Sequence, residues 1–268
     1  MQILYPSDPL DNQNVDDTFL DEYLAAKSAG FTCHLFEFDA LRFDKFKAMP
    51  PITEPADFLY RGWMLDPDGY ARLNQMLEEH GGHLITSPGA YVRCHHITGW
   101  YEQCQEFTAE THFCNSREEM TQLVNKLGWD RYFIKDFVKS NTAGIGSVAE
   151  DAQQAIEIVD MIEMYRGEIE GGIAVRRFEA YKPETEIRYF VVAGKPFSPD
   201  DMVPNVVEKI AEKIDAPFYS IDMIKDRSGN LRLVELGDGQ VSSRKNWPID
   251  KFIDLFGILG NSLNRRKS

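Results

Sequence analysis

Apolar positions in the first hundred residues form short runs that are separated by stretches of helical periodicity. The runs "QILYP", "TCHLFEF", "DFLYRGW" and "HLITS" have the length and composition of strands. Residues 16–30 and 67–80 show helical spacing; the first stretch ends at Gly30, and the second begins after Asp66. Strands that alternate with helices predict a parallel sheet with crossover helices.

The pattern changes at about residue 98. "GWYEQCQEF" and "SREEMTQLVNKLG" are typical of amphipathic helices, and "YFIKDFV", "GIAVRRFEA" and "EIRYFVVAG" are typical of strands. A strand–turn–strand pattern follows in "YSIDMIKDRSGNLRLVEL". Because groups of strands and helices replace strict alternation, we predict an α/β N-terminal domain at residues 1–97 followed by an α+β domain at residues 98–268.

Composition narrows the class of protein. The chain has 268 residues, of which 43% are hydrophobic, enough to bury a sizeable core or two smaller ones. Its formal charge of −14 argues against a broad surface for nucleic acid or an anionic membrane. No apolar run approaches the roughly 20 residues that cross a bilayer, and the first residues lack the regions of a signal peptide. We therefore expect a soluble, cytoplasmic protein.

Cysteine and histidine spacing indicates no dedicated metal site. The four cysteines include no close pair of the kind that binds zinc, so we expect reduced, structural thiols. The histidines include two pairs, His80 with His83 and His95 with His96, but neither pair has a third ligand at helical spacing. The sequence therefore predicts no zinc site.

A possible phosphate site lies in "RYFIKDFVKSNTAGIGSVAE", residues 131–150. A strand carrying Lys135 leads through Lys139 into a loop of small residues. Gly144 and Gly146 allow backbone amides to approach an anion closely, and the two lysines supply positive charge for phosphate oxygens. The alternative is an ordinary loop with two exposed lysines, because a glycine loop alone is a weak signal.

Three further residues have positions that suit ligand binding. Glu186 and Arg188 are two apart in "EIRYFVV" and so share one face of a strand. A structural ion pair is the alternative explanation. Arg61 follows a predicted strand at its carboxyl end, where open α/β sheets tend to bind ligands. A surface arginine at a strand end is the alternative there.

The predicted hairpin places one acid in each apolar strand, Asp222 and Glu235. If Ile224 pairs with Leu231, Asp222 lies opposite Leu233 and Glu235 is its diagonal neighbour on the same face. Such neighbours are roughly 7–8 Å apart, and a hard cation could lie between their oxygens. Two unrelated acids at strand edges are the alternative, since a shift of one residue would separate the two faces.

These features occur in one order, and that order resembles the ATP-grasp superfamily. "LYRGWML", "KDFVKS" and "VELGDGQVS" are similar to a clade of small ATP-grasp proteins named for one arginine and two lysines. The resemblance extends from about residue 2 to about residue 257. It implies that residues 98–268 form two subdomains that clamp ATP, a lid at about 107–175 and a metal-binding part at about 176–268.

Carried over by position, the resemblance implies a set of ATP contacts. Lys135 would contact the adenine edge and the α-phosphate, and Lys139 would be the second lysine of the clade. Residues 141–147 would close over the β- and γ-phosphates, with contacts from Thr142, Gly144 and Gly146. The backbone of Arg177 and Phe178 would bind adenine beside Glu179, and Glu186 would bind the ribose.

The resemblance also implies a metal site and contacts to the reacting groups. Asp222 and Glu235 would hold the metal ion. Many relatives place an asparagine two residues after the second acid, whereas this chain has Gly237 followed by Asp238, so Asp238 is a candidate third ligand. Arg188 would contact a phosphate or the intermediate. Our candidates for binding substrate carboxylates are Arg61 and Arg244, because a guanidinium binds that group through two hydrogen bonds.

The implied reaction is ATP-dependent activation of a carboxylate to an acyl phosphate, followed by attack of an amine to form an amide. The expected cofactors are ATP and Mg²⁺, with Mn²⁺ as an alternative. The expected partners are small-molecule or peptide carboxylates and amines, with no nucleic acid and no membrane. Two other functions stay open, a phosphotransferase on the same fold and a nucleotide-binding protein without turnover. The sequence leaves monomer and homodimer open.

Overall fold

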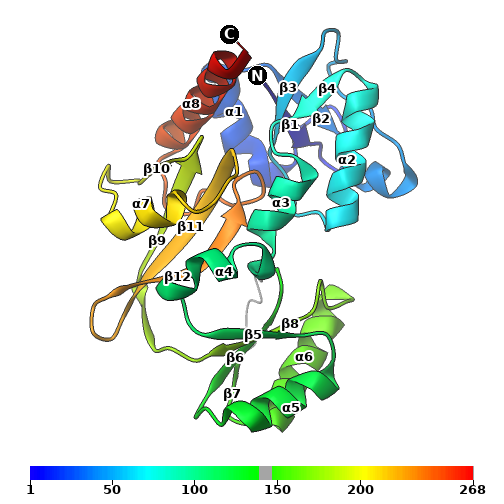
Figure 1. Ribbon diagram of the computed structural model, residues 1–268. Helices are drawn as coiled ribbons and strands as arrows, with labels where there is room; N and C mark the ends of the chain where they lie inside the picture. The colour runs from blue at the N-terminus through cyan, green and yellow to red at the C-terminus, as the bar shows by residue number, and fades with distance from the viewer. Residues whose placement is uncertain (139–146, 268) are drawn as a thin grey trace.

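The computed structural model describes residues 1–138 and 147–267, with side chains to residue 265. Its strands form three sheets of four, of which the first is parallel with the order β2-β1-β3-β4 (Figure 1). The strands of this N-terminal sheet are β1 (Gln2–Pro6), β2 (Cys33–Phe36), β3 (Ala56–Tyr60) and β4 (Gly82–Leu84). The predicted parallel sheet is thereby confirmed.

Helices and short 3₁₀ segments connect these strands. They are η1 (Asp17–Phe19), α1 (Leu20–Ser28), η2 (Phe38–Phe43), α2 (Pro67–Glu79) and α3 (Pro88–His95). The side chain of Asp66 accepts a hydrogen bond from Gly69 N, which caps α2 at the start that the sequence predicts. Ser87 caps α3 in the same way through Ala90 N.

The second sheet is antiparallel, with the order β5-β8-β6-β7, and lies at the opposite end of the molecule from the N-terminal sheet (Figure 1). Its strands are β5 (Thr111–Cys114), β6 (Tyr132–Asp136), β7 (Val148–Ala149) and β8 (Ile173–Arg177). Helices α5 (Arg117–Leu127) and α6 (Ala152–Arg166) pack against it and share its own apolar core. Both end at a glycine in the left-handed conformation, Gly128 and Gly167, the usual way to stop a helix.

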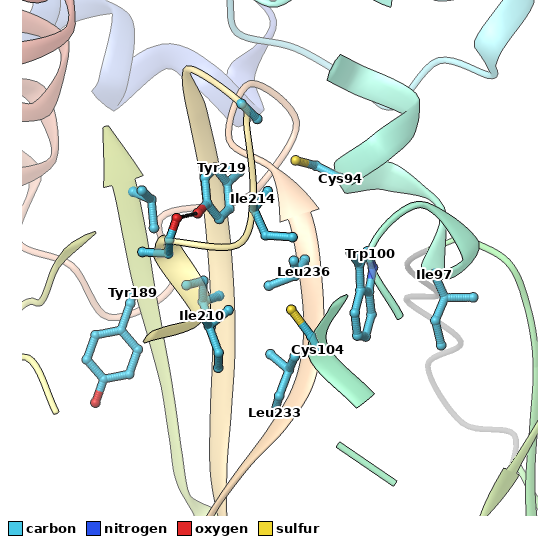
Figure 2. Packing of buried hydrophobic residues seen from close by; sticks show 14 of the residues in the cluster. Cys94, Ile97, Trp100, Cys104, Tyr189, Ile210, Ile214, Tyr219, Leu233 and Leu236 are labelled. Carbon is cyan, nitrogen blue, oxygen red and sulfur yellow. Dashed lines mark hydrogen bonds between the residues drawn. The ribbon is translucent and has the colours of Figure 1, made fainter. Parts of the chain in front are cut away.

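The third sheet is also antiparallel, with the order β10-β9-β11-β12. Its strands are β9 (Tyr181–Val192), β10 (Lys195–Phe197), β11 (Phe218–Asp226) and β12 (Leu231–Asp238). Figure 2 shows one face of this sheet, where Leu233 and Leu236 meet Trp100 and Cys104. Helix α7 (Asn205–Ala211) covers the same face, and its Ala211 carbonyl accepts a hydrogen bond from the Tyr219 hydroxyl at 3.2 Å.

The opposite face of the β9–β12 sheet shares a core with the N-terminal sheet. Phe190 and Phe218 from the sheet pack with Phe252 and Phe256 of α8 (Ile249–Lys267) and with Tyr5 of β1. Helix α8 also lies along α1, which brings the last element of the chain beside the first ones (Figure 1). Among the described residues, no helix is long and apolar enough to cross a membrane.

One predicted helix is wrong in length. "GWYEQCQEF" forms a single four-residue helix, α4 (Tyr101–Cys104), between 3₁₀ segments η3 (Ile97–Gly99) and η4 (Gln105–Phe107). Trp100 and Cys104 both reach the core. The chain then leaves the helical path, because Thr108 donates a hydrogen bond to Leu233 O at 2.7 Å on the way to β5. Tertiary contacts outweigh helical periodicity over such a short segment.

Candidate active site

A cleft of about 890 Å³ lies between the β5–β8 sheet and the β9–β12 sheet and also borders the segment that follows β3. Six of its charged lining residues pair with one another. They are Lys135, Glu186, Arg188, Asp222, Glu235 and Lys245. Five of these six are residues that the sequence singles out, and the fold gathers them from segments separated by up to a hundred residues.

Asp222 and Glu235 lie directly opposite each other on β11 and β12. This corrects the predicted diagonal arrangement. Lys225, not Ile224, pairs with Leu231, and the register shifts between Asp222 and Met223, so that Val234 is an extra residue in β12. Such a bulge re-aims side chains at functional sites. Without it, continuation of the ladder from the turn would place Val234, rather than Glu235, opposite Asp222.

Arg188 of β9 lies opposite Asp222 on the other side of β11 from Glu235. Arg188, Asp222 and Glu235 thus form a row across three neighbouring strands. The Arg188 guanidinium donates two hydrogen bonds to the Asp222 carboxylate, at 2.7 and 2.6 Å, and a third to Ser243 O at 2.7 Å. Both partners are almost fully buried. The two-point contact fixes the Asp222 carboxylate in one orientation.

Two lysines complete the charge balance of the row. Lys245 Nζ lies 2.6 Å from Glu186 and 3.3 Å from the Asp222 carboxylate, and Lys135 Nζ lies 3.4 Å from Glu235 Oε2. Three acids thus face three cations in one cleft. Lys245 was not predicted from the sequence; the available signal was its place beside Arg244 in "SSRKNW".

The Glu235 carboxylate has capacity for a further ligand. Its Oε1 atom is buried and meets no hydrogen-bond partner among the described residues. A buried carboxylate oxygen without a partner costs about 1–3 kcal/mol or more, which a bound cation would offset. Oxygen donors from Asp222 and Glu235 suit a hard dication such as Mg²⁺. The residues present therefore fit a metal ion of that class.

Residues at the end of β8 line another wall of the cleft. Arg177 N donates to Glu110 O at 2.8 Å, and Phe178 N donates to Arg131 O at 3.2 Å. The Arg131 guanidinium lies 3.9 Å from the centre of the Phe178 ring. Glu179 is held by Arg232 through two hydrogen bonds, at 2.9 and 2.8 Å. This wall is thus a rigid segment tied to both sheets.

Apolar side chains cover part of the cleft on both sides. Phe133 and Val148 come from the β5–β8 sheet, and Val234 comes from β12. Arg176, which was not predicted from the sequence, reaches the cleft from β8 and donates to Val234 O at 3.0 Å. Burial lowers the pKa of the Arg176 guanidinium. The backbone of the bulge residue Val234 in β12 is thus bound by an arginine of the β5–β8 sheet.

Arg61 borders the cleft, but its guanidinium binds protein groups. It donates to both Glu22 oxygens, at 2.7 and 2.8 Å, and to the carbonyls of Gly239, Gln240 and Ser242 at 2.5, 2.8 and 3.1 Å. Its side chain is 2% exposed. Arg61 therefore joins α1 to the chain that leaves β12, and a surface arginine is ruled out.

The structure does not bring Arg244 and Asp238 into the cleft, since neither is among the described residues that line it. Arg244 donates to Trp247 O at 2.9 Å. Asp238 Oδ1 accepts hydrogen bonds from the backbone and side-chain nitrogens of Gln240, at 2.9 and 3.1 Å. Burial raises the pKa of the Asp238 carboxyl to about 7. On β12, Asp238 and Glu235 are three apart and so point to opposite faces.

The remaining predicted contacts cannot be placed. Lys139, Thr142, Gly144 and Gly146 lie outside the described residues. The cysteines are free and buried, as expected.

Comparison with known proteins gives a family. The model of family 3 of the ATP-grasp clade named for one arginine and two lysines matches residues 98–255, more than half of the chain. No curated protein matches.

The solved structures that share the fold include the following three. A RimK domain ATP-grasp protein from Sphaerobacter thermophilus is 14% identical with a TM-score of 0.61, over 97% of this chain and 98% of that one. D-alanyl-alanine synthetase A from Vibrio cholerae is 12% identical, with a TM-score of 0.60 over 98% of each chain. The ATP-grasp ligase PsnB, complexed with a variant of its minimal precursor, Mg and ADP, is 12% identical with a TM-score of 0.56, over 97% of this chain and 99% of that one.

The order of charged motifs along the chain, their convergence in one cleft and the family match lead to one conclusion. The chain belongs to the ATP-grasp superfamily, in family 3 of the clade named for one arginine and two lysines.

Proposed function

We propose that the cleft binds Mg²⁺ and ATP and that the protein joins a carboxylate to an amine, with release of ADP and phosphate. The observation that carries the proposal is the row of Arg188, Asp222 and Glu235 across three strands, with Lys135 against Glu235. A solved structure of PsnB, which has the same fold, is a complex with Mg and ADP. Mn²⁺ is the alternative metal, since it accepts the same oxygen donors.

In this proposal the acids hold the metal ion and the cations hold the phosphates. Asp222 and Glu235 bind the metal ion, which supplies charge neutralisation at the transferred phosphoryl group. Lys135 then turns from Glu235 to phosphate oxygens, together with Lys139. Arg188 already neutralises Asp222 and contacts the intermediate from the same row.

The nucleoside would occupy the other end of the cleft. The backbone at Arg177 and Phe178, beside Glu179, contacts adenine, and Glu186 contacts the ribose. In this proposal the flat base lies between Phe133 and Val148 on one side and Val234 on the other; the support for it is that these apolar side chains line the same cavity. Because Arg177 N and Phe178 N already donate to Glu110 O and Arg131 O, their hydrogen bonds would hold this wall in place against the base rather than recognise it directly.

Closure of two subdomains would exclude water from the labile acyl phosphate. The lid, about residues 107–175, carries Lys135, and the metal-binding part, about 176–268, carries Asp222 and Glu235. The amine then attacks the acyl carbon, and phosphate leaves with the bonding electrons. Arg61 supports this site by holding the chain after β12. The likeness to D-alanyl-alanine synthetase and to PsnB favours an amino acid or a peptide as substrate.

The proposal is tested by ADP release in the presence of Mg²⁺, ATP and panels of amino acids and short peptides. We expect release that needs both an acid and an amine and that yields free phosphate. A phosphotransferase would instead leave the phosphoryl group on the acceptor, and a binding protein would bind ATP without turnover. Lys135→Ala should abolish release, whereas Lys126→Ala, an exposed lysine on α5, should not.

A further inference from the structure

A second cluster of metal-ligating side chains lies outside the cleft. His95 ends α3, His96 follows it, and Glu170 lies between α6 and β8. His96 Nε2 is 3.0 Å from Glu170 Oε1, and His95 Nε2 is 3.7 Å from the same oxygen. One ligand atom from each residue lies within 4.8 Å of the other two. Three donors thus converge on one point, and none of the three lines the cleft described above.

The donors are buried and their orientation is supported by neighbours. His95 is 2% exposed and His96 is 9% exposed. The His95 ring stacks on Tyr91, with centres 4.8 Å apart. Arg166 contacts the other oxygen of Glu170, Oε2, at 3.3 Å, which leaves Oε1 directed at the histidines. Neighbours that orient the ligands in this way are a regular property of metal sites.

Backbone hydrogen bonds hold the three segments together. Ile97 N donates to Phe137 O at 2.8 Å, and Phe137 N donates to Glu170 O at 3.2 Å. His96 also forms an isolated bridge with Val138. The cluster is therefore preformed, and its ligands need to move only a short way to reach the distances of about 2.0–2.2 Å that zinc requires.

The charges at the cluster favour a cation. Glu170 and Asp136 contribute two carboxylates, and Arg166 contacts both, at 3.3 Å and 2.8 Å. Arg166 contacts only one oxygen of Glu170, so the other oxygen faces the two histidines with its negative charge available to a cation. Imidazole nitrogens together with a carboxylate suit zinc and related transition metals, in contrast to the oxygen-only set of Asp222 and Glu235.

We propose that His95, His96 and Glu170 bind one transition-metal dication of the zinc class. Three protein ligands leave a fourth position for water or another group. A bound ion would join the end of α3 to the turn before β8, beside the end of β6. Because β6 carries Lys135, the ion would stabilise the strand from which this lysine enters the cleft.

The test is direct metal binding, which does not depend on turnover of any substrate. Zn²⁺ is titrated into the full chain by calorimetry, with Mg²⁺ in large excess to occupy oxygen sites, and Co²⁺ is followed by its visible absorption. We expect one Zn²⁺ per chain, a rise in the unfolding temperature and Co²⁺ bands typical of mixed nitrogen and oxygen ligands. His96→Gln and Glu170→Gln should each weaken Zn²⁺ binding by at least about tenfold. Loss of a residue that only orients a ligand already weakens metal binding by about that factor, and these two residues are ligands themselves.

His112→Gln is the matched control, because His112 forms an exposed pair with Glu110 at 3.1 Å. Binding should be unchanged in this variant. Circular dichroism shows whether each variant is folded. If one of the two ligand variants does not fold, the other still tests the proposal. The proposal is overturned if folded wild-type protein takes up no stoichiometric Zn²⁺, or if binding survives in the folded ligand variants, or if His112→Gln weakens it equally.

Discussion

At the scale of single residues, the charged groups of the cleft balance one another. Asp222 is held by Arg188, Glu186 by Lys245, and Glu235 by Lys135. Residue types predicted the acids and Lys135, but they could not predict the partners, because an ion pair depends on distances set by the whole fold. Arg61 is the clearest case: its type suggested a substrate contact, and its place in the fold pairs it with Glu22.

The Arg61–Glu22 pair should stabilise the protein strongly. Glu22→Gln removes the charge that compensates a buried guanidinium, so we expect a loss of about 3–5 kcal/mol in the free energy of unfolding. Urea denaturation measures it. Asp201→Asn breaks an exposed ion pair with Lys251 and should cost about 1 kcal/mol at most. Equal effects of the two substitutions would contradict a structural role for Arg61.

Asp238 should make stability fall as pH rises. Burial raises the pKa of its carboxyl to about 7 in the folded chain, whereas the unfolded value is about 4. Between about pH 4 and pH 7 the folded chain therefore keeps a proton that the unfolded chain releases. The free energy of unfolding falls across this range as pH rises. A shift of three units corresponds to roughly 4 kcal/mol.

Asp238→Asn should remove this part of the pH dependence. Urea denaturation of both proteins across that range gives their difference in unfolding free energy. We expect the unfolding free energy of the variant to increase relative to that of the wild type as pH rises. This difference should become constant above pH 7. Burial also raises the pKa of Asp136, to about 6. Because Asp136 is present in both proteins, its contribution cancels in the difference. A difference that stays constant with pH would show that Asp238 does not titrate as described.

At the scale of elements, the β11–β12 hairpin and the chain that leaves it organise the site. The bulge at Val234 brings Glu235 opposite Asp222. The segment after β12 then supplies carbonyls to Arg61 and Arg188. The apolar pattern predicted the hairpin but not its register. The turn is shorter than predicted, so that Lys225 pairs with Leu231, and the bulge then adds one further residue without a distinct sequence signal.

Gly239 should tolerate no side chain. A Cβ there would lie 2.6 Å from the ring of Phe218, which is fully buried. We expect Gly239→Ala to cost about 1–3 kcal/mol and to lower ADP release, because it displaces the carbonyls that hold Arg61. Thermal unfolding and the ADP assay measure both effects.

Gly257→Ala is the control for this substitution. In the described part of the chain a Cβ on Gly257 meets nothing within 4 Å, and alanine favours a helix by up to about 1 kcal/mol. We therefore expect equal or higher stability and unchanged ADP release. If both alanine variants lose stability and ADP release to the same extent, close packing at Gly239 is not the cause of the loss.

At the scale of the whole molecule, the cleft lies between a sheet with its own core and a sheet that shares a core with the N-terminal unit. Most of the apolar residues of the β5–β8 sheet pack in its own core with α5 and α6, and only Ala174 of β8, with Phe137 after β6, joins the core of the β9–β12 sheet. This division favours motion of the β5–β8 sheet relative to the rest. The shared core instead ties α8 and the N-terminal sheet to the β9–β12 sheet, which contains the β11–β12 hairpin.

Nucleotide binding should bring the two sides of the cleft together. Dyes on cysteines that replace Lys126 of α5 and Lys209 of α7 can report the distance, because both positions are exposed and the native cysteines are buried. We expect energy transfer to rise when Mg²⁺ and a non-hydrolysable ATP analogue are added, and to rise less with Lys135→Ala. Unchanged transfer at saturating nucleotide would argue against closure.

Periodicity and residue type, which act locally along the chain, were enough to predict the parallel N-terminal sheet, the later change to α+β order and five of the charged residues that meet in the cleft. The sequence by itself also carried the resemblance to the family. Tertiary structure alone decided the pairing of Arg61 with Glu22, the burial of Asp238, the place of Lys245 and the register at Val234. It also brought Glu170 to the adjacent pair His95 and His96, a third ligand that sequence spacing could not reveal. These depend on contacts between segments far apart in the chain, which local pattern does not encode.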